Sequence, residues 1–290
     1  MNWQTTRFLI ELASPKVMGI VNVTPDSFSD GGLHASTQAA IRHCEKLLMD
    51  GADILDIGGE STRPGAQPLP LGDELARVLP LLTEAVKLGV PISVDSYKPQ
   101  VMQAALDLGA DIINDIWALR QPGAPGALDG AQVVAAHPRC GICVMHMHGE
   151  PATMQIHPME GDVVLPVLSF LEHVTHNLLR LGVDSNRIVI DPGIGFGKTA
   201  KQNFSLLARQ KELLAGGYPL LAGWSRKSSL AAIAGLPSVS TKDSVHNERM
   251  VPSVAAALLA VERGASIVRV HDVRETVQAL KVFAALGQAN

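Results

Sequence analysis

The sequence predicts an α/β protein folded as a (β/α)8 TIM barrel with a short N-terminal extension, in a single domain spanning residues 1–290. Hydrophobic residues make up 47% of the chain but aromatic residues only 4%, so the core should consist mainly of Ala, Val, Ile and Leu, as in parallel sheets covered by helices. The length suits one such barrel, which takes about 250 residues. Eight short runs rich in Val and Ile provide the strands: 17–21, 53–57, 92–94, 111–113, 142–145, 188–190, 220–222 and 266–270.

The segments between these runs have the apolar spacing of helices, as at Leu75, Val78, Leu82 and Val86, and each is long enough to cross back over a sheet. Several end at a glycine, which accepts the left-handed turn before the next strand. These glycines are Gly51, Gly89, Gly109, Gly182 and Gly264. The regular repetition favours a barrel, although periodicity by itself also allows a doubly wound open sheet.

Composition argues against several classes of protein. The formal net charge is −4 and no run of Lys or Arg is present, so we expect neither nucleic acid nor a membrane as a partner. The N-terminus lacks a basic stretch with an apolar signal core, and no segment is apolar over the roughly 18 residues needed to span a bilayer, which predicts a cytoplasmic location. Cys140 and Cys143 form a Cys-x-x-Cys pair beside an apolar run, and we expect them, like Cys44, to be reduced thiols.

Polar residues follow every one of the eight runs at its C-terminal end. In a (β/α)8 barrel these ends share one face, so side chains scattered along the chain should converge on one pocket. The polar segments begin at Asn22, Gly58, Asp95, Asn114, His146, Asp191, Arg226 and Arg269.

Two of these segments are long and distinctive. Residues 22–32 read Asn-Val-Thr-Pro-Asp-Ser-Phe-Ser-Asp-Gly-Gly, and residues 56–65 read Asp-Ile-Gly-Gly-Glu-Ser-Thr-Arg-Pro-Gly. With further motifs at 113–116, 145–147, 191–198, 225–228 and 269–272, the chain closely resembles the dihydropteroate synthases from residue 17 to the C-terminus. The resemblance implies a transferase of folate biosynthesis that joins (7,8-dihydropterin-6-yl)methyl diphosphate to 4-aminobenzoate and releases pyrophosphate.

A diphosphate leaving group needs cations or oriented N–H donors. The resemblance assigns this role to Asn22, Arg269 and His271, from the first and eighth strands, and we expect Arg63 to join them. It also implies Mg²⁺ as cofactor with Asn22 as its protein ligand, and Asp30 joins when the first loop closes. On the residues alone, Asn22 could equally form a turn before the following Thr-Pro pair.

The pterin presents a guanine-like edge that a carboxylate can bind with two hydrogen bonds, and Asp191 is the candidate. The residues alone also allow Asp191 to form a turn or cap, and Asp95 to form an ion pair with Lys98. The resemblance places the following residues around the pterin diphosphate: Thr62, Asp95, Asn114, Met145, Gly223, Lys227, Arg269 and His271. Ile116 should complete the apolar wall beside Met145.

The second substrate is a flat aromatic amine with a carboxylate, and it needs an apolar slot closed by an anion site. Phe28, Pro64 and Phe196 can form the slot. Ser228 is expected at a helix N-terminus, where free N–H groups favour a carboxylate, and Thr62 should join it. The Ser-Arg-Lys-Ser segment could instead be a solvated helix cap.

We expect the arylamine nitrogen to displace diphosphate with no covalent enzyme intermediate, while the loops at 22–32 and 58–68 close over the site. The catalytic residues would be Asp30, Arg63, Asp95, Lys227, Arg269 and His271. Two other classes stay open on the residues: a pterin-binding barrel like the folate-binding modules of corrinoid methyltransferases, and an aldolase-like lyase with a Schiff base on Lys227.

His146 and His148 could suggest a metal site on one strand, but no second pair of ligands has suitable spacing. Tyr97 stands where the family usually has a small polar residue, and the segment 117–126 is slightly long. The apolar residues of 251–259 and of the final helix, with the resemblance, suggest a homodimer, although core helices look the same.

Overall fold

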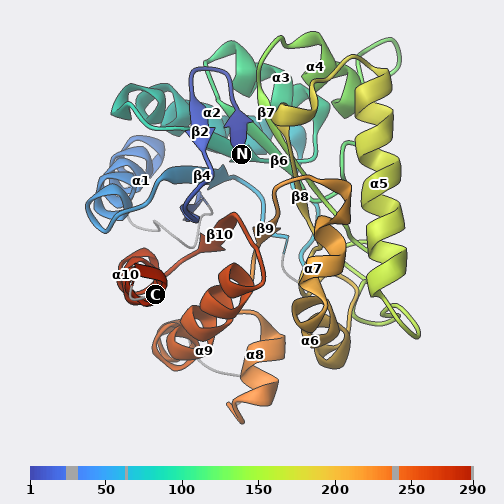
Figure 1. The fold of residues 1–290 in the computed structure, drawn as a ribbon. Helices are drawn as coiled ribbons and strands as arrows, with labels where there is room; N and C mark the ends of the chain where they lie inside the picture. The colour runs from blue at the N-terminus through green and yellow to red at the C-terminus, as the bar shows by residue number, and fades with distance from the viewer. Residues whose placement is uncertain (24–31, 63–64, 237–241, 289–290) are drawn as a thin grey trace.

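The computed structural model describes residues 1–23, 32–62, 65–236 and 242–288, and it confirms the predicted barrel (Figure 1). Eight parallel strands are hydrogen-bonded in the order β8-β7-β6-β5-β4-β3-β10-β9. A parallel bridge between Ile190 and Leu220 joins the two end strands, so the ring is nearly closed. The strands are β3 (Lys16–Asn22), β4 (Ile54–Gly58), β5 (Ile92–Asp95), β6 (Ile112–Asp115), β7 (Gly141–Met145), β8 (Ile188–Asp191), β9 (Leu221–Ala222) and β10 (Ile267–Val270).

Helices alternate with the strands and cover the outside of the ring (Figure 1). The helix-facing sides of the strands pack against them in one continuous core of Val, Ile, Leu and Ala. All five glycines predicted to end helices have positive φ, from 74° at Gly89 to 102° at Gly51. The helices are α1 (Gly32–Met49), α2 (Leu71–Ala85), α3 (Pro99–Asp107), α4 (Gly130–Ala136), α5 (Val164–Arg180), α6 (Ala200–Ala208), α7 (Gln210–Leu213), α8 (Ser228–Ile233), α9 (Lys242–Glu262) and α10 (Val273–Gln288).

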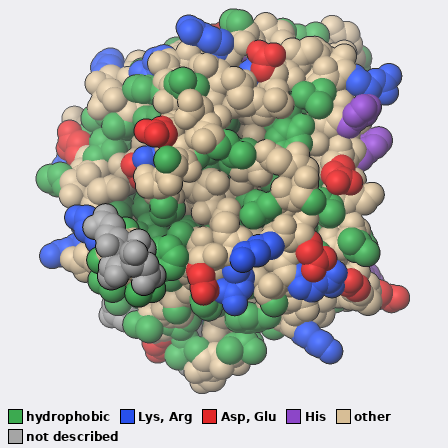
Figure 2. Space-filling model, in the orientation of Figure 1, with side chains coloured by type: hydrophobic (Ala, Val, Ile, Leu, Met, Phe, Trp, Pro, Cys, Tyr) green, Lys and Arg blue, Asp and Glu red, His purple; other side chains and the backbone are tan. Residues whose placement is uncertain are grey.

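The surface carries both signs of charge. On the face shown in Figure 2, Lys and Arg side chains are interspersed with Asp and Glu, and no continuous basic patch is visible there. Within the part of the chain that the structure describes, no helix combines the length and apolarity needed to cross a membrane.

Side chains on the inner face of the barrel change character along the strands. Because side chains alternate between the two faces of a strand, every second residue points inward. At the N-terminal end these inward residues are apolar and form one cluster that includes Met18, Ile54, Ile112, Cys143, Val189, Leu221 and Ile267. Two residues further along, four of the same strands place Asp56, Asn114, Asp191 and Arg269. We call the apolar N-terminal end of the barrel interior the floor, and the polar C-terminal end the mouth.

The N-terminal extension closes the floor. It forms an antiparallel hairpin of β1 (Asn2–Gln4) and β2 (Leu9–Glu11), and Trp3 in β1 is fully buried in the apolar cluster of the floor. The Trp3 indole Nε1 donates to the carbonyl oxygen of Arg187 at 2.9 Å. The Arg7 guanidinium binds the Asp111 carboxylate at 2.6 Å. The hairpin is therefore a plug fixed to the residues that lead into β6 and β8.

Replacing Trp3 with Ala should lower the free energy of unfolding by about 3–5 kcal/mol, the usual cost of emptying a large aromatic site in a core. Trp3→Phe should lose much less, and Met49→Ala, at a side chain that is 82% exposed, should change it by no more than about 0.5 kcal/mol. Urea unfolding followed by circular dichroism measures all three. Equal, small effects of Trp3→Ala and Met49→Ala would place the hairpin outside the cooperative core.

Candidate active site

The polar mouth is organised around the guanidinium of Arg269. Its Nε donates to Asp56 Oδ2 at 2.6 Å and its Nη2 donates to Asp95 Oδ2 at 2.6 Å, so one cation holds carboxylates from β4 and β5. The Asn114 amide Nδ2 also donates to Asp56 Oδ2, at 3.2 Å. The two carboxylates raise the pKa of Arg269, which stays charged although it is largely buried. Among the described residues no partner binds its Nη1, which leaves that nitrogen for a ligand.

Asp95 does not form the ion pair with Lys98 that the residues alone allowed, because Lys98 binds Glu60 and Glu74 instead. Burial raises the pKa of Asp95 to about 7, against the opposing effect of Arg269, and the nearby Asp56 raises it further. Two carboxylates thus compete for one guanidinium. Asp56 Oδ1 and the Ser93 hydroxyl, neighbours in the sheet register, are both buried without a hydrogen-bond partner among the described residues, and a ligand or a water could satisfy both.

Asp191 lies across the mouth at the end of β8. Its Oδ1 accepts a hydrogen bond from the Gly193 backbone N–H at 2.7 Å, so the turn interaction considered for this residue does exist. It occupies only one oxygen: a Cβ at Gly223 would lie 3.8 Å from Asp191 Oδ2, which means that the missing side chain of Gly223 leaves space beside that oxygen. Burial raises the pKa of Asp191.

Lys227 lies between β9 and α8, close enough to Asp191 for their charges to interact. Its Nζ lies 4.2 Å from the ring centroid of Phe196, and its Cδ would lie 3.1 Å from a Cβ at Gly195, so the stem of the lysine runs along the loop that follows β8. Burial lowers the pKa of Lys227 to about 8, and the Asp191 carboxylate opposes that shift. Phe196 belongs to an apolar cluster with Ile116 and Met145, the predicted wall.

The loop after β8 is held by a buried lysine. Lys198 Nζ lies 2.9 Å from the Gly193 carbonyl oxygen, 3.1 Å from that of Phe196 and 2.9 Å from His146 Nδ1. These three acceptors match the three donors of an ammonium group. Burial lowers the pKa of Lys198 to about 7, while the nearby Asp191 carboxylate opposes the shift. His146, the residue that suggested a metal site, is therefore a partner of Lys198, and burial lowers its pKa to about 3.

Asn22 and His271 line one cavity of about 440 Å³ beside α1, together with the half-buried face of Arg226. The Ser225 hydroxyl contacts His271 twice: it lies 2.9 Å from the ring Nδ1, and it accepts a hydrogen bond from the backbone N–H of His271 at 3.1 Å. Arg226 pairs with the Asp272 carboxylate at 2.7 Å. Neighbouring residues of the seventh and eighth βα units are thus cross-linked at the mouth.

The remaining predicted residues divide into two groups. Thr62 is half-buried in the loop after β4, and Ser228 is exposed as the first residue of α8, directly after Lys227. The others lie outside the described residues: Phe28, Asp30, Arg63 and Pro64.

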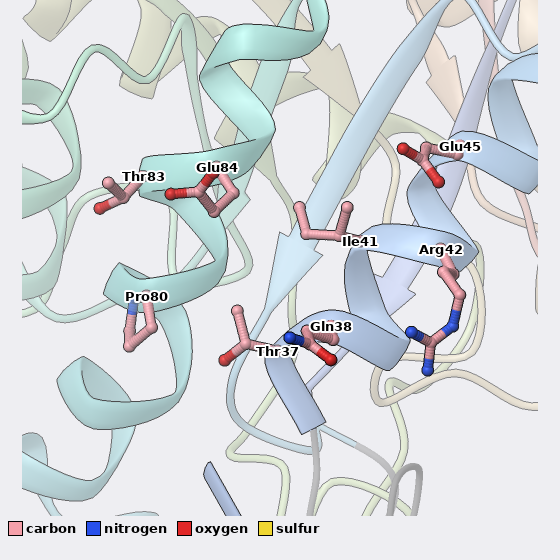
Figure 3. A pocket seen from close by; sticks show the side chains of 8 residues that line it. All are labelled: Thr37, Gln38, Ile41, Arg42, Glu45, Pro80, Thr83 and Glu84. Atoms are coloured by element: carbon pink, nitrogen blue, oxygen red, sulfur yellow. The ribbon is translucent and has the colours of Figure 1, made fainter. Parts of the chain in front are cut away.

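A larger hollow, of about 640 Å³, lies away from the barrel mouth. Figure 3 shows it between α1 and α2 on the outside of the barrel, and none of its lining residues is a predicted site residue. The size of a hollow is therefore a poor guide to the chemistry here. Its lining consists of Thr37, Gln38, Ile41, Arg42, Glu45, Pro80, Thr83 and Glu84.

Sequence reasoning missed three residues of the mouth. Asp56 holds Arg269, Lys198 holds the loop after β8, and Ser225 holds His271. Asp56 could have been found, because it is a charged residue in the run Ile-Leu-Asp-Ile-Gly, two positions after the inward-facing Ile54. For Lys198 and Ser225, only their places inside the quoted motifs were a signal.

The chain is similar to known proteins over nearly its whole length. Residues 18–271 match the family described as pterin binding enzymes. The dihydropteroate synthase of Neisseria meningitidis serogroup B is 49% identical, over 98% of this chain and 97% of its own. The Burkholderia cenocepacia dihydropteroate synthase complexed with 7,8-dihydropteroate has a TM-score of 0.86 at 48% identity, covering 99% of this chain and 97% of that one. The Xanthomonas albilineans dihydropteroate synthase with 4-aminobenzoic acid has a TM-score of 0.86 at 45% identity, and the match covers 96% of this chain and 95% of that one.

Asp191→Asn should lower the pKa of Lys227 further below its ordinary value, because the Asp191 carboxylate stabilises the ammonium form. At pH 7 a larger fraction of Lys227 would then be the free amine, and its reductive methylation, followed by peptide mass spectrometry, should become a few-fold faster. Lys87, exposed and paired with Glu84, serves as the internal control and should not change. An unchanged or slower rate at Lys227 would mean that the two side chains are not electrostatically coupled.

Proposed function

The chain belongs to the pterin-binding enzyme family, as a dihydropteroate synthase, and from this premise we propose how its barrel mouth carries out the reaction. The bond between the exocyclic methylene of the dihydropterin and a diphosphate oxygen breaks. The amine nitrogen of 4-aminobenzoate bonds to that methylene and loses a proton. The observation that carries the proposal is the guanidinium of Arg269, fixed between Asp56 and Asp95 at the mouth with one nitrogen left over.

The pterin ring is proposed to lie in the polar mouth against Met145. Asp191, with one carboxylate oxygen beside the space left by Gly223, accepts hydrogen bonds from the amino edge of the ring. Asn114 and Asp95 face the ring from the neighbouring strands β6 and β5. Lys227 donates to the ring from the side of Asp191, opposite Asn114 and Asp95.

The diphosphate is proposed to lie at the rim where β3 and β10 pair. Arg269 offers its remaining nitrogen there, and Asn22 and His271 line the adjoining cavity. Arg63 is expected to add a second guanidinium. Because Arg269 is held by two carboxylates before the substrate arrives, it needs little reorganisation to stabilise the charge that develops on the leaving group.

Mg²⁺ fits this rim through the chemistry of the available donors. Mg²⁺ prefers oxygen ligands, keeps several waters and often takes only one or two ligands from the protein, with the rest from substrate phosphates. The Asn22 amide oxygen is such a donor, half-buried in the cavity with His271, and Asp30 is the proposed second one. When bound, Mg²⁺ would neutralise charge on the diphosphate oxygens.

We propose a dissociative path, in which the methylene carries positive charge as the diphosphate departs. Asp95, which is partly exposed, and the buried Asp191 are proposed to stabilise the cationic pterin, which gives these carboxylates a role beyond binding. The 4-aminobenzoate is proposed to lie against Phe196, with Phe28 and Pro64, and its carboxylate near Ser228 and Thr62. The stem of Lys227 separates the two substrates and excludes water from the reacting carbon.

Arg269→Met should reduce kcat about 10²- to 10³-fold, the usual cost of removing a preorganised donor to a developing anion. The measurement is release of pyrophosphate that requires both the dihydropterin diphosphate and 4-aminobenzoate, with Mg²⁺ present. Arg269→Lys should recover part of the rate, and Arg263→Met, at a surface ion pair with Glu262, should act like the wild type. Retention of more than half of the wild-type kcat by Arg269→Met would remove the guanidinium from the mechanism.

We also propose that the enzyme is a homodimer in the cytoplasm. Adjacent helices α9 and α10 expose large apolar side chains: Val251 is 69% exposed and Leu259 42% on α9, and Val282 75% and Leu286 66% on α10. A second copy of the chain would cover them. The three cysteines are buried thiols without disulfides, which suits a reducing compartment.

Sedimentation equilibrium should give twice the chain mass of 30.7 kDa, and Val282→Glu should shift the protein toward the monomer because it places a charge in the buried face. Arg274→Glu, at an exposed polar position at the start of the same helix, should leave the dimer intact. A wild-type protein that sediments as a monomer at micromolar concentration would contradict the dimer.

A further inference from the structure

The end of β5 and the residues that directly follow it bind two different parts of the molecule. Asp95, the last residue of β5, binds Arg269 inside the barrel, whereas Tyr97 and Lys98 bind Glu60 in the loop after β4. Both contact the same carboxylate: the Tyr97 hydroxyl donates to Glu60 Oε1 at 2.9 Å, and Lys98 Nζ donates to Glu60 Oε2. Glu60 precedes Thr62 by two residues.

The contact is largely shielded from water. The side chain of Glu60 is 8% exposed and that of Lys98 is 13% exposed, so salt and solvent screen their attraction less than at the surface. The carboxylates of Glu60 and Glu74 raise the pKa of Lys98 although burial lowers it, and burial with the Glu60 hydrogen bond raises the pKa of Tyr97 to about 12. Both donors therefore keep their protons throughout the physiological pH range.

The start of the loop is also fixed from the side of α2. Lys98 shares its ammonium between Glu60 and Glu74, and Glu74, in the first turn of α2, is only 1% exposed. Arg77 on the same helix donates to the Gly59 carbonyl oxygen at 3.1 Å. A Cβ at Gly59 would lie 2.7 Å from the Val78 side chain, so the backbone of the loop lies directly on the helix. Residues 59 and 60 are thus clamped between α2 and the segment after β5.

The ring of Tyr97, unlike its hydroxyl, packs against the apolar wall of the barrel mouth. Its ring lies 6.1 Å from that of Trp117 and packs against the cluster that contains Ile116, Met145 and Phe196. Lys98 Nζ lies 4.7 Å from the centre of the Tyr97 ring. The Tyr97 side chain therefore contacts the proposed pterin wall with its ring and the loop after β4, which we call the second loop, with its hydroxyl.

We propose that Tyr97 and Lys98 are positioning residues that hold Glu60, and through it the loop carrying Thr62, in the place required to receive 4-aminobenzoate. The inference rests on the proposed placement of that substrate near Thr62. The hydrogen bond from Tyr97 is particular to chains with a tyrosine at this position, whereas the ammonium of Lys98 is the common anchor of Glu60 and Glu74. Loss of either donor releases the second loop and leaves the pterin pocket intact.

The decisive variant is Tyr97→Phe, which removes the hydroxyl and keeps the ring packing. The KM for 4-aminobenzoate should rise about fivefold or more, the range expected when a hydrogen bond to a charged acceptor is lost. Equilibrium binding of 6-hydroxymethylpterin should stay at the wild-type value, and the melting temperature should fall by no more than several degrees, as expected for one lost hydrogen bond. The chain contains only one other tyrosine, Tyr218, which is half-buried far along the sequence, so Tyr218→Phe is the matched control and should change neither constant.

Three further variants test the shared carboxylate. Lys98→Met should raise the KM for 4-aminobenzoate more than Tyr97→Phe does, because Glu60 and Glu74 then lose their cation. Lys98→Arg keeps the positive charge, so its KM should lie close to the wild-type value. Glu60→Gln should mimic Tyr97→Phe, and the double variant of Tyr97→Phe with Glu60→Gln should be no worse than Glu60→Gln alone. Lys87→Met, at an exposed pair with Glu84, is the control for removing a lysine.

Two results would overturn the proposal. One is an unchanged KM for 4-aminobenzoate in Tyr97→Phe and Lys98→Met. The other is a parallel loss of pterin affinity and melting temperature in both, which would make the cluster a purely structural support. Either result leaves wild-type pyrophosphate release untouched, so it is distinguishable from failure of the proposed reaction, in which the wild type itself would release no pyrophosphate with the two substrates. If Lys98→Met does not fold, Tyr97→Phe and Glu60→Gln decide the question.

Discussion

The barrel mouth depends on one constraint: a single guanidinium, that of Arg269, compensates two carboxylates that the sheet register brings into the interior. Asp56 and Asp95 face inward from adjacent strands, and burying both without a cation would be costly. The pairing holds the Arg269 guanidinium through its Nε and Nη2. Asn114 adds a neutral donor to the same carboxylate, so the network extends over four strands. Binding and catalysis can thus use groups that the folded chain has already arranged.

The architecture could be predicted from the sequence because each strand, helix end and polar strand end is marked by residues close together in the chain. Val- and Ile-rich runs gave the strands, glycines with positive φ ended the helices, and polar residues marked the ends of the strands. The pairings inside the mouth could not be predicted in this way. Asp56 and Arg269 are 213 positions apart, and their contact depends on the register between β3, β4 and β10. Lys98 shows the same limit: the nearest carboxylate in sequence, Asp95, is not its partner, because their side chains lie on opposite sides of the segment.

Glycine and lysine cooperate in the loop that follows β8. Three glycines with positive φ, Gly193, Gly195 and Gly197, let the chain curl tightly enough that its carbonyl oxygens converge. Lys198 then supplies the donors for them from inside the curl. Added side chains would not fit: a Cβ at Gly193 would lie 1.8 Å from the His146 carbonyl oxygen. The motif is therefore one structural unit, which fixes the Gly193 N–H that orients Asp191 and the ring that supports Lys227.

The plug at the floor of the barrel has a consequence for how the protein is made. Trp3 is synthesised long before its hydrogen-bond acceptor, Arg187, which follows 184 residues later, and the floor is completed only by Leu221 and Ile267. Until then the hairpin has no socket, and its apolar face stays in contact with water or with other chains. The nascent chain thus exposes the apolar side of this hairpin while the barrel strands are being translated, and chaperone capture or premature association is a hazard during that interval.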